Sequence, residues 1–190
     1  PYKDGDILKN RYRILSQDSG GQSQIYFCFD LWSQVPCVLK ASGIQKPDAL
    51  QAESNVQKPD APQENSGIQK PDALQAELQN LLNLPSHKNV VKLYRLEQIQ
   101  SEYYIVMEWL PNSLKSLLAG SMPVPAEKTA TIALSVCLGM IHCQKHLSQP
   151  KKPFVHGNLK PSNLLFTQEG NVKITDFGTS RLLQDFPLSP

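Results

Sequence analysis

Hydrophobic residues before position 110 occur mainly in short runs, whereas those after it recur at helical spacing. Runs of β-branched and aromatic residues predict strands over residues 25–29, 35–39, 90–96 and 103–107. One helix is expected among these strands, because Leu74, Leu78, Leu81 and Leu82 form a stripe at helical spacing that stops before Pro85. The first half of the chain is therefore predicted to form a small sheet with one helix.

The region after Pro111 favours helices. A short helix is predicted over residues 113–118 and a long one over 126–146. The long one carries an apolar stripe that comprises Ala133, Leu134, Val136, Cys137, Leu138, Met140 and Ile141. A stripe of this width indicates a helix that is buried on most sides. Two short strands are expected at 164–166 and 172–175, on either side of a turn, so the overall pattern indicates an α+β fold.

A repeat of twelve residues separates the second and third predicted strands. Its three copies occupy residues 42–53, 54–65 and 66–77, and each contains Gln-Lys-Pro-Asp. Such units are too short and too polar to stack as a solenoid, so residues 42–71 are interpreted as a flexible insertion. The insertion either presents repeated motifs to a binding partner or is a neutral repeat expansion. Only the third copy runs directly into the leucine stripe of the predicted helix.

Composition narrows the range of functions. A chain of 190 residues with 40% hydrophobic content can bury a core, and its net charge of +2 gives no electrostatic case for nucleic acid or for a membrane surface. No apolar run is long enough to span a bilayer, so a soluble protein in the cytoplasm is expected, with no membrane insertion. The four cysteines lack the spacing of a metal site and are interpreted as reduced thiols in the interior.

Two motifs near the end of the chain suggest phosphoryl transfer. They are His156-x-x-Leu159-Lys160-Pro161-x-Asn163 and, thirteen residues after Asn163, Asp176-Phe177-Gly178. In this order and spacing the chain resembles the protein kinase family over nearly its whole length. The resemblance implies that Asn163 and Asp176 hold the Mg²⁺ ions that bridge the phosphates of ATP. Carboxylate and amide oxygens are ligands that such hard cations prefer.

Further motifs occur where kinases have them. Cys37-Val38-Leu39-Lys40 resembles the strand whose lysine contacts the α- and β-phosphates, and Glu77 resembles its partner on the single helix of the N-terminal lobe. Glu53 holds the same place in the first repeat and is the competing candidate. We favour Glu77 because apolar residues at helical spacing follow it. A flexible insertion of about 30 residues spans only roughly 30 Å, so it need not keep Lys40 and Glu77 apart.

Residues 104–110 are similar to the strand and hinge that receive adenine in kinases. The resemblance implies that Met107 guards the adenine pocket and that backbone groups of Glu108 and Leu110 pair with the base. Ile25 and Leu165 would then cover its two faces.

The chain departs from the family at the loop that covers the phosphates. Kinases have a G-x-G-x-x-G loop, because glycine lets backbone amides approach the phosphates closely. Here Gly20 and Gly21 are kept as cofactor-binding candidates, but Asp18 and Ser23 occupy the first and third glycine positions. A carboxylate beside a triphosphate is repulsive, so weaker binding of ATP is expected.

The catalytic loop also departs from the family. Asn158 stands where kinases have the aspartate that accepts the proton of the substrate hydroxyl, and an amide has no useful basicity near neutral pH. Gly157 replaces the arginine that meets a phosphorylated activation loop, so this kind of switching is not expected. Lys160 is retained, and Lys160-Pro161 resembles serine/threonine kinases more than tyrosine kinases.

The resemblance implies a two-lobed kinase-like fold. Residues 1–107 would form a small antiparallel β N-lobe with one helix, and residues 108–190 the hinge and part of a helical C-lobe that ends after the D-F-G motif. The A-P-E motif and later helices do not follow within the 190 residues. The long helix at 126–146 is therefore expected to expose apolar surface, which favours aggregation or a protein partner.

Three interpretations of the function follow. The favoured one is a pseudokinase or kinase fragment that holds ATP and Mg²⁺ but transfers phosphate weakly or not at all. A genuine serine/threonine kinase that acts on a protein substrate is the alternative from the enzyme class. The third is a scaffold on which the repeats at 42–71 bind a protein partner.

Overall fold

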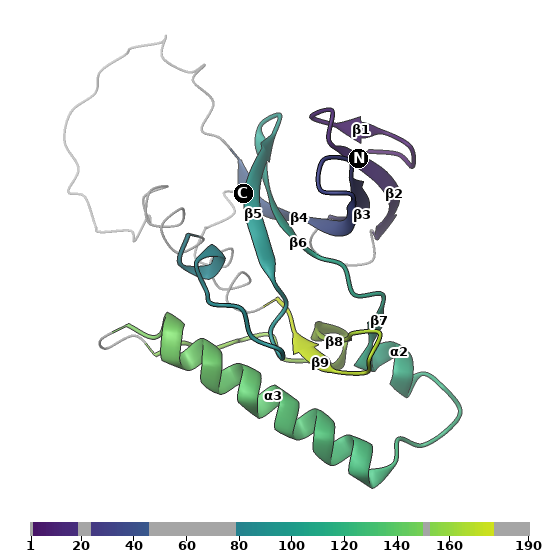
Figure 1. Ribbon diagram of the computed structural model, residues 1–190, viewed down its shortest axis with the longest axis vertical. Helices are drawn as coiled ribbons and strands as arrows, with labels where there is room; N and C mark the ends of the chain where they lie inside the picture. Colours follow the sequence, from purple (N-terminus) through teal and green to yellow (C-terminus); the bar gives the residue numbers. More distant parts are fainter. Residues whose placement is uncertain (1, 19–23, 46–78, 150–152, 177–190) are drawn as a thin grey trace, which may run out of the picture.

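The computed structural model describes residues 2–18, 24–45, 79–149 and 153–176 (Figure 1). Within these residues, six strands form an antiparallel sheet in the order β1-β2-β3-β4-β6-β5. The strands are β1 (Ile7–Leu8), β2 (Tyr12–Asp18), β3 (Ile25–Asp30), β4 (Val35–Gln45), β5 (Leu93–Ile99) and β6 (Glu102–Glu108). This sheet is the predicted antiparallel N-lobe, and the thin grey trace in Figure 1 marks the residues that the structure leaves undescribed.

The predicted strands at 25–29, 35–39 and 103–107 are confirmed as β3, β4 and β6. The insertion was expected to begin at residue 42, but β4 continues to Gln45, which pairs with Glu102 of β6 across an irregularity in the register. The strand expected from residue 90 begins only at Leu93, because Val90 forms a parallel bridge with Ile174 of the other lobe. The remaining residues of the repeats, 46–77, lie outside the described residues.

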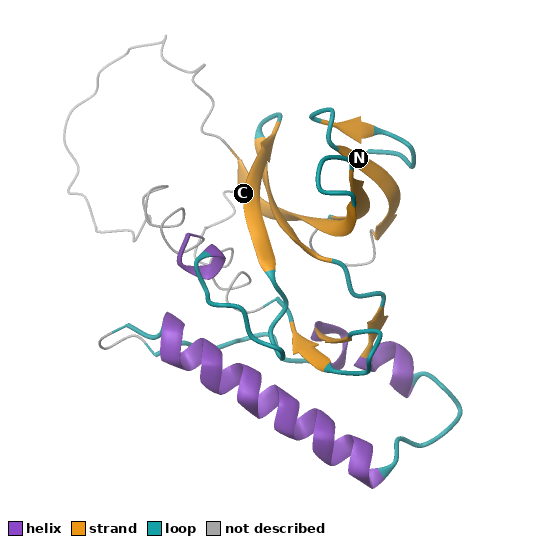
Figure 2. Cartoon of the chain, viewed as in Figure 1, coloured by secondary structure: helices purple, strands orange, loops and turns teal. Residues whose placement is uncertain are grey.

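The C-terminal part of the described chain combines a small sheet with helices (Figure 2). Among the described residues its sheet has the order β7-β8-β9, formed by β7 (Asn112–Ser113), β8 (Leu164–Phe166) and β9 (Val172–Ile174). The helices are α2 (Leu114–Leu118), α3 (Ala126–Leu147) and the short 3-10 helix η1 (Pro161–Asn163). Ser113 begins α2 with a capping box, because its side chain accepts the Ser116 N–H and its own N–H donates to Ser116.

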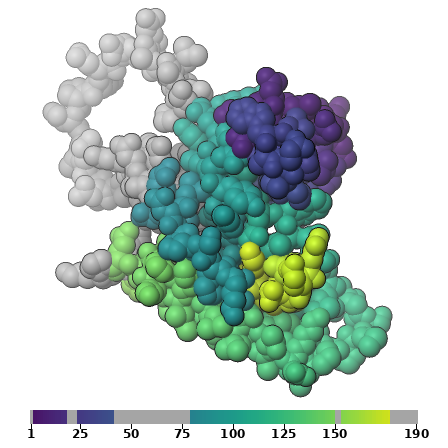
Figure 3. Space-filling model, in the orientation of Figure 1, coloured from purple at the N-terminus to yellow at the C-terminus, as the bar shows by residue number. Residues whose placement is uncertain are grey.

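One face of α3 packs against β9, and its opposite face is exposed. Ile132, Gly139 and Cys143 are buried on the inner face. Leu134 is 60% exposed and Ile141 is 61% exposed on the outer face. The prediction that α3 is buried on most sides is therefore wrong, and the expected exposure of apolar surface on this helix is confirmed. Figure 3 shows α3 and the N-terminal strands at opposite ends of the molecule.

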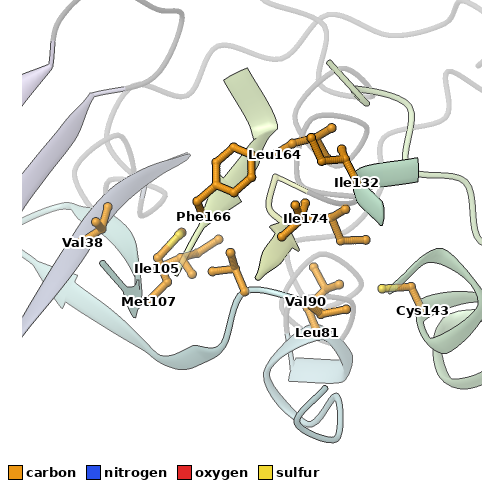
Figure 4. Close-up of a cluster of buried hydrophobic side chains, with 12 residues drawn as sticks. Val38, Leu81, Val90, Ile105, Met107, Ile132, Cys143, Leu164, Phe166 and Ile174 are labelled. Carbon is orange, nitrogen blue, oxygen red and sulfur yellow. The ribbon is translucent and has the colours of Figure 1, made fainter. Parts of the chain in front are cut away.

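A shared hydrophobic core joins the two sheets (Figure 4). Val38, Ile105 and Met107 come from the N-terminal sheet, and they pack in one cluster with Phe166 and Ile174 from the C-terminal sheet. Leu81, in the helical turn at 79–82, is only 6% exposed and belongs to the same cluster, so this part of the leucine stripe faces the core as predicted.

Another cluster lies within the N-terminal sheet and contains buried tyrosines beside cysteines. All four cysteines are free thiols. Cys28, Cys37 and Cys143 are buried, as expected, but Cys137 lies on the exposed face of α3. Burial raises the pKa of the Cys143 thiol to about 12, so this thiol stays protonated near neutral pH.

Candidate functional site

An ion pair between Lys40 and Asp176 connects the two sheets. Lys40 lies in β4, where the register places it between Ile25 of β3 and Ile105 of β6. Asp176 follows β9 and has a left-handed backbone conformation with φ of +64°. The Lys40 ammonium donates to Asp176 Oδ1, and the two side chains are only 13% and 14% exposed. The structure thus brings together two predicted site residues that lie 136 positions apart in the sequence.

The loop after α3 surrounds the same carboxylate. Asn158 Nδ2 donates to Asp176 Oδ2 at 2.7 Å, and Asn163 Nδ2 lies 3.4 Å from the same oxygen. Asn163 Nδ2 also donates to the backbone carbonyl of Asn158 at 2.7 Å. The Asn163 backbone adds two hydrogen bonds, since its N–H donates to Lys160 and its carbonyl accepts the Thr175 N–H. The spacing of the two motifs therefore places Asn158, Asn163 and Asp176 in one hydrogen-bonded group.

The His156 ring makes contacts through both of its nitrogens. Its Nε2 lies 3.1 Å from the Thr175 carbonyl oxygen, and its Nδ1 accepts the Asn158 N–H at 3.3 Å. Because a carbonyl can only accept, Nε2 carries the proton and the ring is the neutral Nε2–H tautomer. Burial lowers the pKa of His156, since the charged ring would lose its hydration. The ring thus orients the backbone at Asn158 without adding charge to the site.

The residues predicted to surround adenine lie between the two sheets. Met107 is 8% exposed and pairs with Val38 across β4 and β6. Ile25 and Leu165 are partly buried and pack against the same core cluster, and so does Leu110 in the hinge. These residues come from β3, β6, β8 and the connection after β6, so chain segments that are far apart in sequence line one region.

The Glu108 carboxylate accepts hydrogen bonds from other residues of the chain. Its carboxylate accepts from Lys173 Nζ at 2.7 and 2.9 Å, and its Oε1 also accepts the backbone N–H of Lys92 at 2.6 Å. The carboxylate therefore ties the hinge to β9 in the C-terminal sheet. The backbone N–H of Glu108 also donates to the Lys92 carbonyl at 3.0 Å, so the predicted pairing with a base would have to use the backbone carbonyl of Glu108.

Two further residues at this place were not predicted as site residues. Val38 faces Met107 and is 8% exposed in the shared core. Thr175 Oγ1 lies 3.9 Å from the sulfur of Met107, so the residue before Asp176 contacts the residue before the hinge. The position of Val38, two residues before Lys40 on the same strand face, was the available sequence signal. No local pattern marks Thr175.

Several of the predicted site residues lie in parts of the chain that the structure does not describe. Gly20, Gly21, Glu77 and the competing Glu53 lie outside the described residues, and so do Phe177 and Gly178. Lys160 lies within the described residues and is exposed.

The donor set suits Mg²⁺. The Asn163 amide nitrogen donates to the Asn158 carbonyl and lies 3.4 Å from Asp176 Oδ2, so its amide oxygen is the atom that would be left to meet a cation, together with the carboxylate of Asp176. Mg²⁺ is bound in nucleotide sites by one or two side-chain oxygens together with phosphates and water. Among the described residues, no group of three or more His, Cys, Asp or Glu is placed to hold a metal ion without such help.

Comparisons with known proteins agree with this geometry. The family model described as protein kinase domain matches residues 20–187. The chain therefore belongs to the protein kinase family, with the α+β kinase-like fold that the resemblance implied. Within the described residues, no helix combines the length and the apolar character that crossing a membrane requires.

The most similar curated proteins include serine/threonine kinases from animals and bacteria. The chain is 26% identical to "Serine/threonine-protein kinase tousled-like 1" of Homo sapiens over 189 residues, which cover 97% of the chain and 22% of that protein. It is 27% identical to tousled-like 2 of Xenopus tropicalis, over 97% of the chain and 24% of that protein. It is 32% identical to PrkC of Bacillus subtilis (strain 168) over 110 residues, or 57% of the chain and 16% of that protein. The chain thus spans less than a quarter of the length of these relatives.

Proposed function

We propose that the chain is a kinase-like domain that binds ATP with Mg²⁺ and transfers phosphate weakly or not at all. The observation that carries this proposal is the contact between Asn158 and Asp176. The Asn158 amide donates a hydrogen bond to the carboxylate, at the position where an active kinase has a general base. An amide cannot accept the proton of an attacking hydroxyl near neutral pH.

The proposed role of each residue is the one that the family resemblance implies. Lys40 would contact the phosphates, with Glu77 as its partner, while Asn163 and Asp176 would hold Mg²⁺. The bound Mg²⁺ would supply charge neutralisation for the phosphates. Met107, Glu108, Leu110, Ile25 and Leu165 would enclose and pair with the base, and Gly20 and Gly21 would approach the phosphates. Lys160, exposed beside Asn158 in sequence, would face a protein substrate.

The loss of the base sets the size of the expected defect. A positioned general base accelerates proton transfer by roughly 10²- to 10⁴-fold, which is about 3 to 5 kcal/mol of activation free energy. Positioning and electrostatic stabilisation carry most of phosphoryl transfer and do not require Asn158 to be basic. Slow turnover with intact nucleotide binding is therefore the expected combination.

A genuine serine/threonine kinase is the second candidate, and one observation favours it. The hydrogen bonds among Lys160, Asn163 and Thr175 hold the catalytic loop against the segment that carries Asp176. A substrate hydroxyl could then attack the γ-phosphate of bound ATP slowly and release ADP, with its proton passing to water rather than to a side-chain base. Under this candidate, Asn158→Asp should raise phosphate incorporation into protein sharply, whereas a domain that only binds nucleotide would show no gain.

Nucleotide binding can be tested by thermal unfolding with increasing ATP and Mg²⁺. A ligand at 100 times its Kd stabilises the folded state by about 2.7 kcal/mol, so Tm should rise by several degrees. Lys40→Met should abolish the rise, and Lys115→Met, an exposed lysine on α2, should leave it intact. If millimolar nucleotide leaves the Tm of the unmodified chain unchanged, the nucleotide-binding part of the proposal is wrong.

A further inference from the structure

The Asp176 carboxylate is contacted by N–H donors on both of its oxygens. The Lys40 ammonium donates to Oδ1, whereas Oδ2 accepts from Asn158 Nδ2 at 2.7 Å and lies 3.4 Å from Asn163 Nδ2. The Asn158 contact is the shorter of the two amide contacts. Asn158 thus donates a hydrogen bond to the same oxygen, Asp176 Oδ2, that lies near the amide nitrogen of the proposed metal ligand Asn163.

The charges of these described side chains balance. Lys40 and Asp176 carry opposite unit charges, Asn158 and Asn163 are neutral, and burial lowers the pKa of neighbouring His156, which favours its neutral form. If aspartate replaced Asn158 in this chain with the backbone unchanged, a second carboxylate would lie at hydrogen-bonding distance from Asp176 Oδ2. Two carboxylates this close repel each other unless a proton or a cation lies between them.

We propose that Asn158 is a positioning residue that replaces the need for a divalent cation in assembling this site. Its amide donates to Asp176 Oδ2, so protein donors alone can hold the Lys40–Asp176 pair and the loop around Asn163 together. Nucleotide binding at this site therefore depends less on Mg²⁺ than it would with aspartate at position 158. This last consequence rests on the proposed function, whereas the assembly of the site does not.

The first test measures Tm of the full chain without nucleotide, in EDTA and in millimolar Mg²⁺. The unmodified chain should have the same Tm in both conditions. Asn158→Asp should melt at a lower temperature in EDTA and recover when Mg²⁺ is added. Asn112→Asp, which makes the same charge change at an exposed position of β7, should not respond to Mg²⁺. A general loss of packing would lower Tm equally in both conditions, so the Mg²⁺ response separates positioning from a merely structural role.

The second test measures the Kd of ATP by calorimetry with and without Mg²⁺. The affinity of the unmodified chain should change by less than about tenfold on removal of Mg²⁺, and that of Asn158→Asp by considerably more. If Asn158→Asp does not fold, the unmodified chain alone still tests the inference. A loss of more than about 100-fold in its affinity for ATP in EDTA would overturn the inference. A Tm of the unmodified chain that rises on Mg²⁺ addition as much as that of Asn158→Asp would also overturn it. If ATP binds under neither condition, the proposed function fails, and the metal-only experiment still tests the assembly of the site.

Discussion

Gly139 of α3 lies directly against the backbone carbonyl of Asn89. A Cβ atom at Gly139 would stand 2.6 Å from that oxygen and 3.3 Å from Cδ1 of Ile174. The same Asn89 carbonyl accepts the Ile174 N–H at 3.0 Å, and Asn89 Nδ2 donates to the Val172 carbonyl at 2.8 Å. The segment that leads into β5 is therefore fixed to both α3 and β9, close to the core that the two sheets share.

Gly139→Ala should destabilise the protein because the added methyl group collides with backbone, which cannot move aside as a side chain can. We expect a loss of about 1 to 3 kcal/mol in the free energy of unfolding, measured by urea denaturation. The sign of the change in the free energy of unfolding is informative, since alanine within a helix is favoured over glycine by about 1 kcal/mol when no collision occurs. A stabilised Gly139→Ala variant would mean that α3 does not approach Asn89 as closely as the structure shows.

A buried carboxylate joins the N-terminal strands on the side away from the candidate site. Asp30 is 2% exposed and accepts two hydrogen bonds from Arg11, both at 2.9 Å, and one from Arg95 at 2.8 Å. Burial by itself would raise the pKa of Asp30, but hydrogen bonds from Arg11, Ser33, Trp32 and Arg95 hold it well below its usual range. The unfolded chain therefore takes up this proton at a higher pH than the folded protein does.

Asp30 should accordingly stabilise the fold at neutral pH and lose that contribution as the pH falls below about 4. Asp30→Asn should cost about 3 to 5 kcal/mol at pH 7, because two arginines lose their buried partner. The variant should also lose less stability than the unmodified chain on acidification from pH 5 to pH 3. The check is urea denaturation across this range, with exposed Asp4→Asn as the matched control. Equal acid sensitivity of Asp30→Asn and the unmodified chain would contradict the assigned role.

Two isoleucines of α3 offer a matched comparison of its faces. Ile132 is 8% exposed and packs in the core, whereas Ile141 is 61% exposed. Ile132→Ala should lower the free energy of unfolding by about 2 to 5 kcal/mol, and Ile141→Ala should change it by less than about 0.5 kcal/mol. Chemical denaturation at low protein concentration measures both. A similar cost at the two positions would show that the outer face of α3 is covered in solution.

The sequence predicted the elements whose apolar pattern is strong and left out those that are mostly polar. Strand β2 has only Tyr12 and Ile14 buried, and its remaining residues face solvent, so its pattern resembles a loop. Val90 and Val91 have strong β propensity, yet tertiary contacts with Ile174 place them between the sheets rather than in β5. The Arg11–Asp30–Arg95 contacts join residues separated by 19 and 65 positions, and no local pattern reveals such pairs.

For the candidate site, the spacing of the motifs predicted which residues lie together but not which hydrogen bonds and ion pairs they form. Lys40 and Asp176 were grouped only through the family resemblance, and the structure places them in an ion pair. The replacement at Asn158 was interpreted from the sequence as the loss of a base. Its hydrogen bond to Asp176 depends on the left-handed backbone at Asp176 and on the fold of the loop, so the sequence alone could not show that the amide also gains a contact.

Phosphate incorporation by the unmodified chain gives the most direct test of the central proposal. The purified protein would be incubated with labelled ATP, Mg²⁺ and a general serine/threonine protein substrate, while nucleotide binding is followed in the same sample. We expect bound ATP with incorporation close to background, because Asn158 offers no acceptor for the hydroxyl proton. Rapid incorporation that Lys40→Met abolishes would contradict this expectation and identify an active kinase.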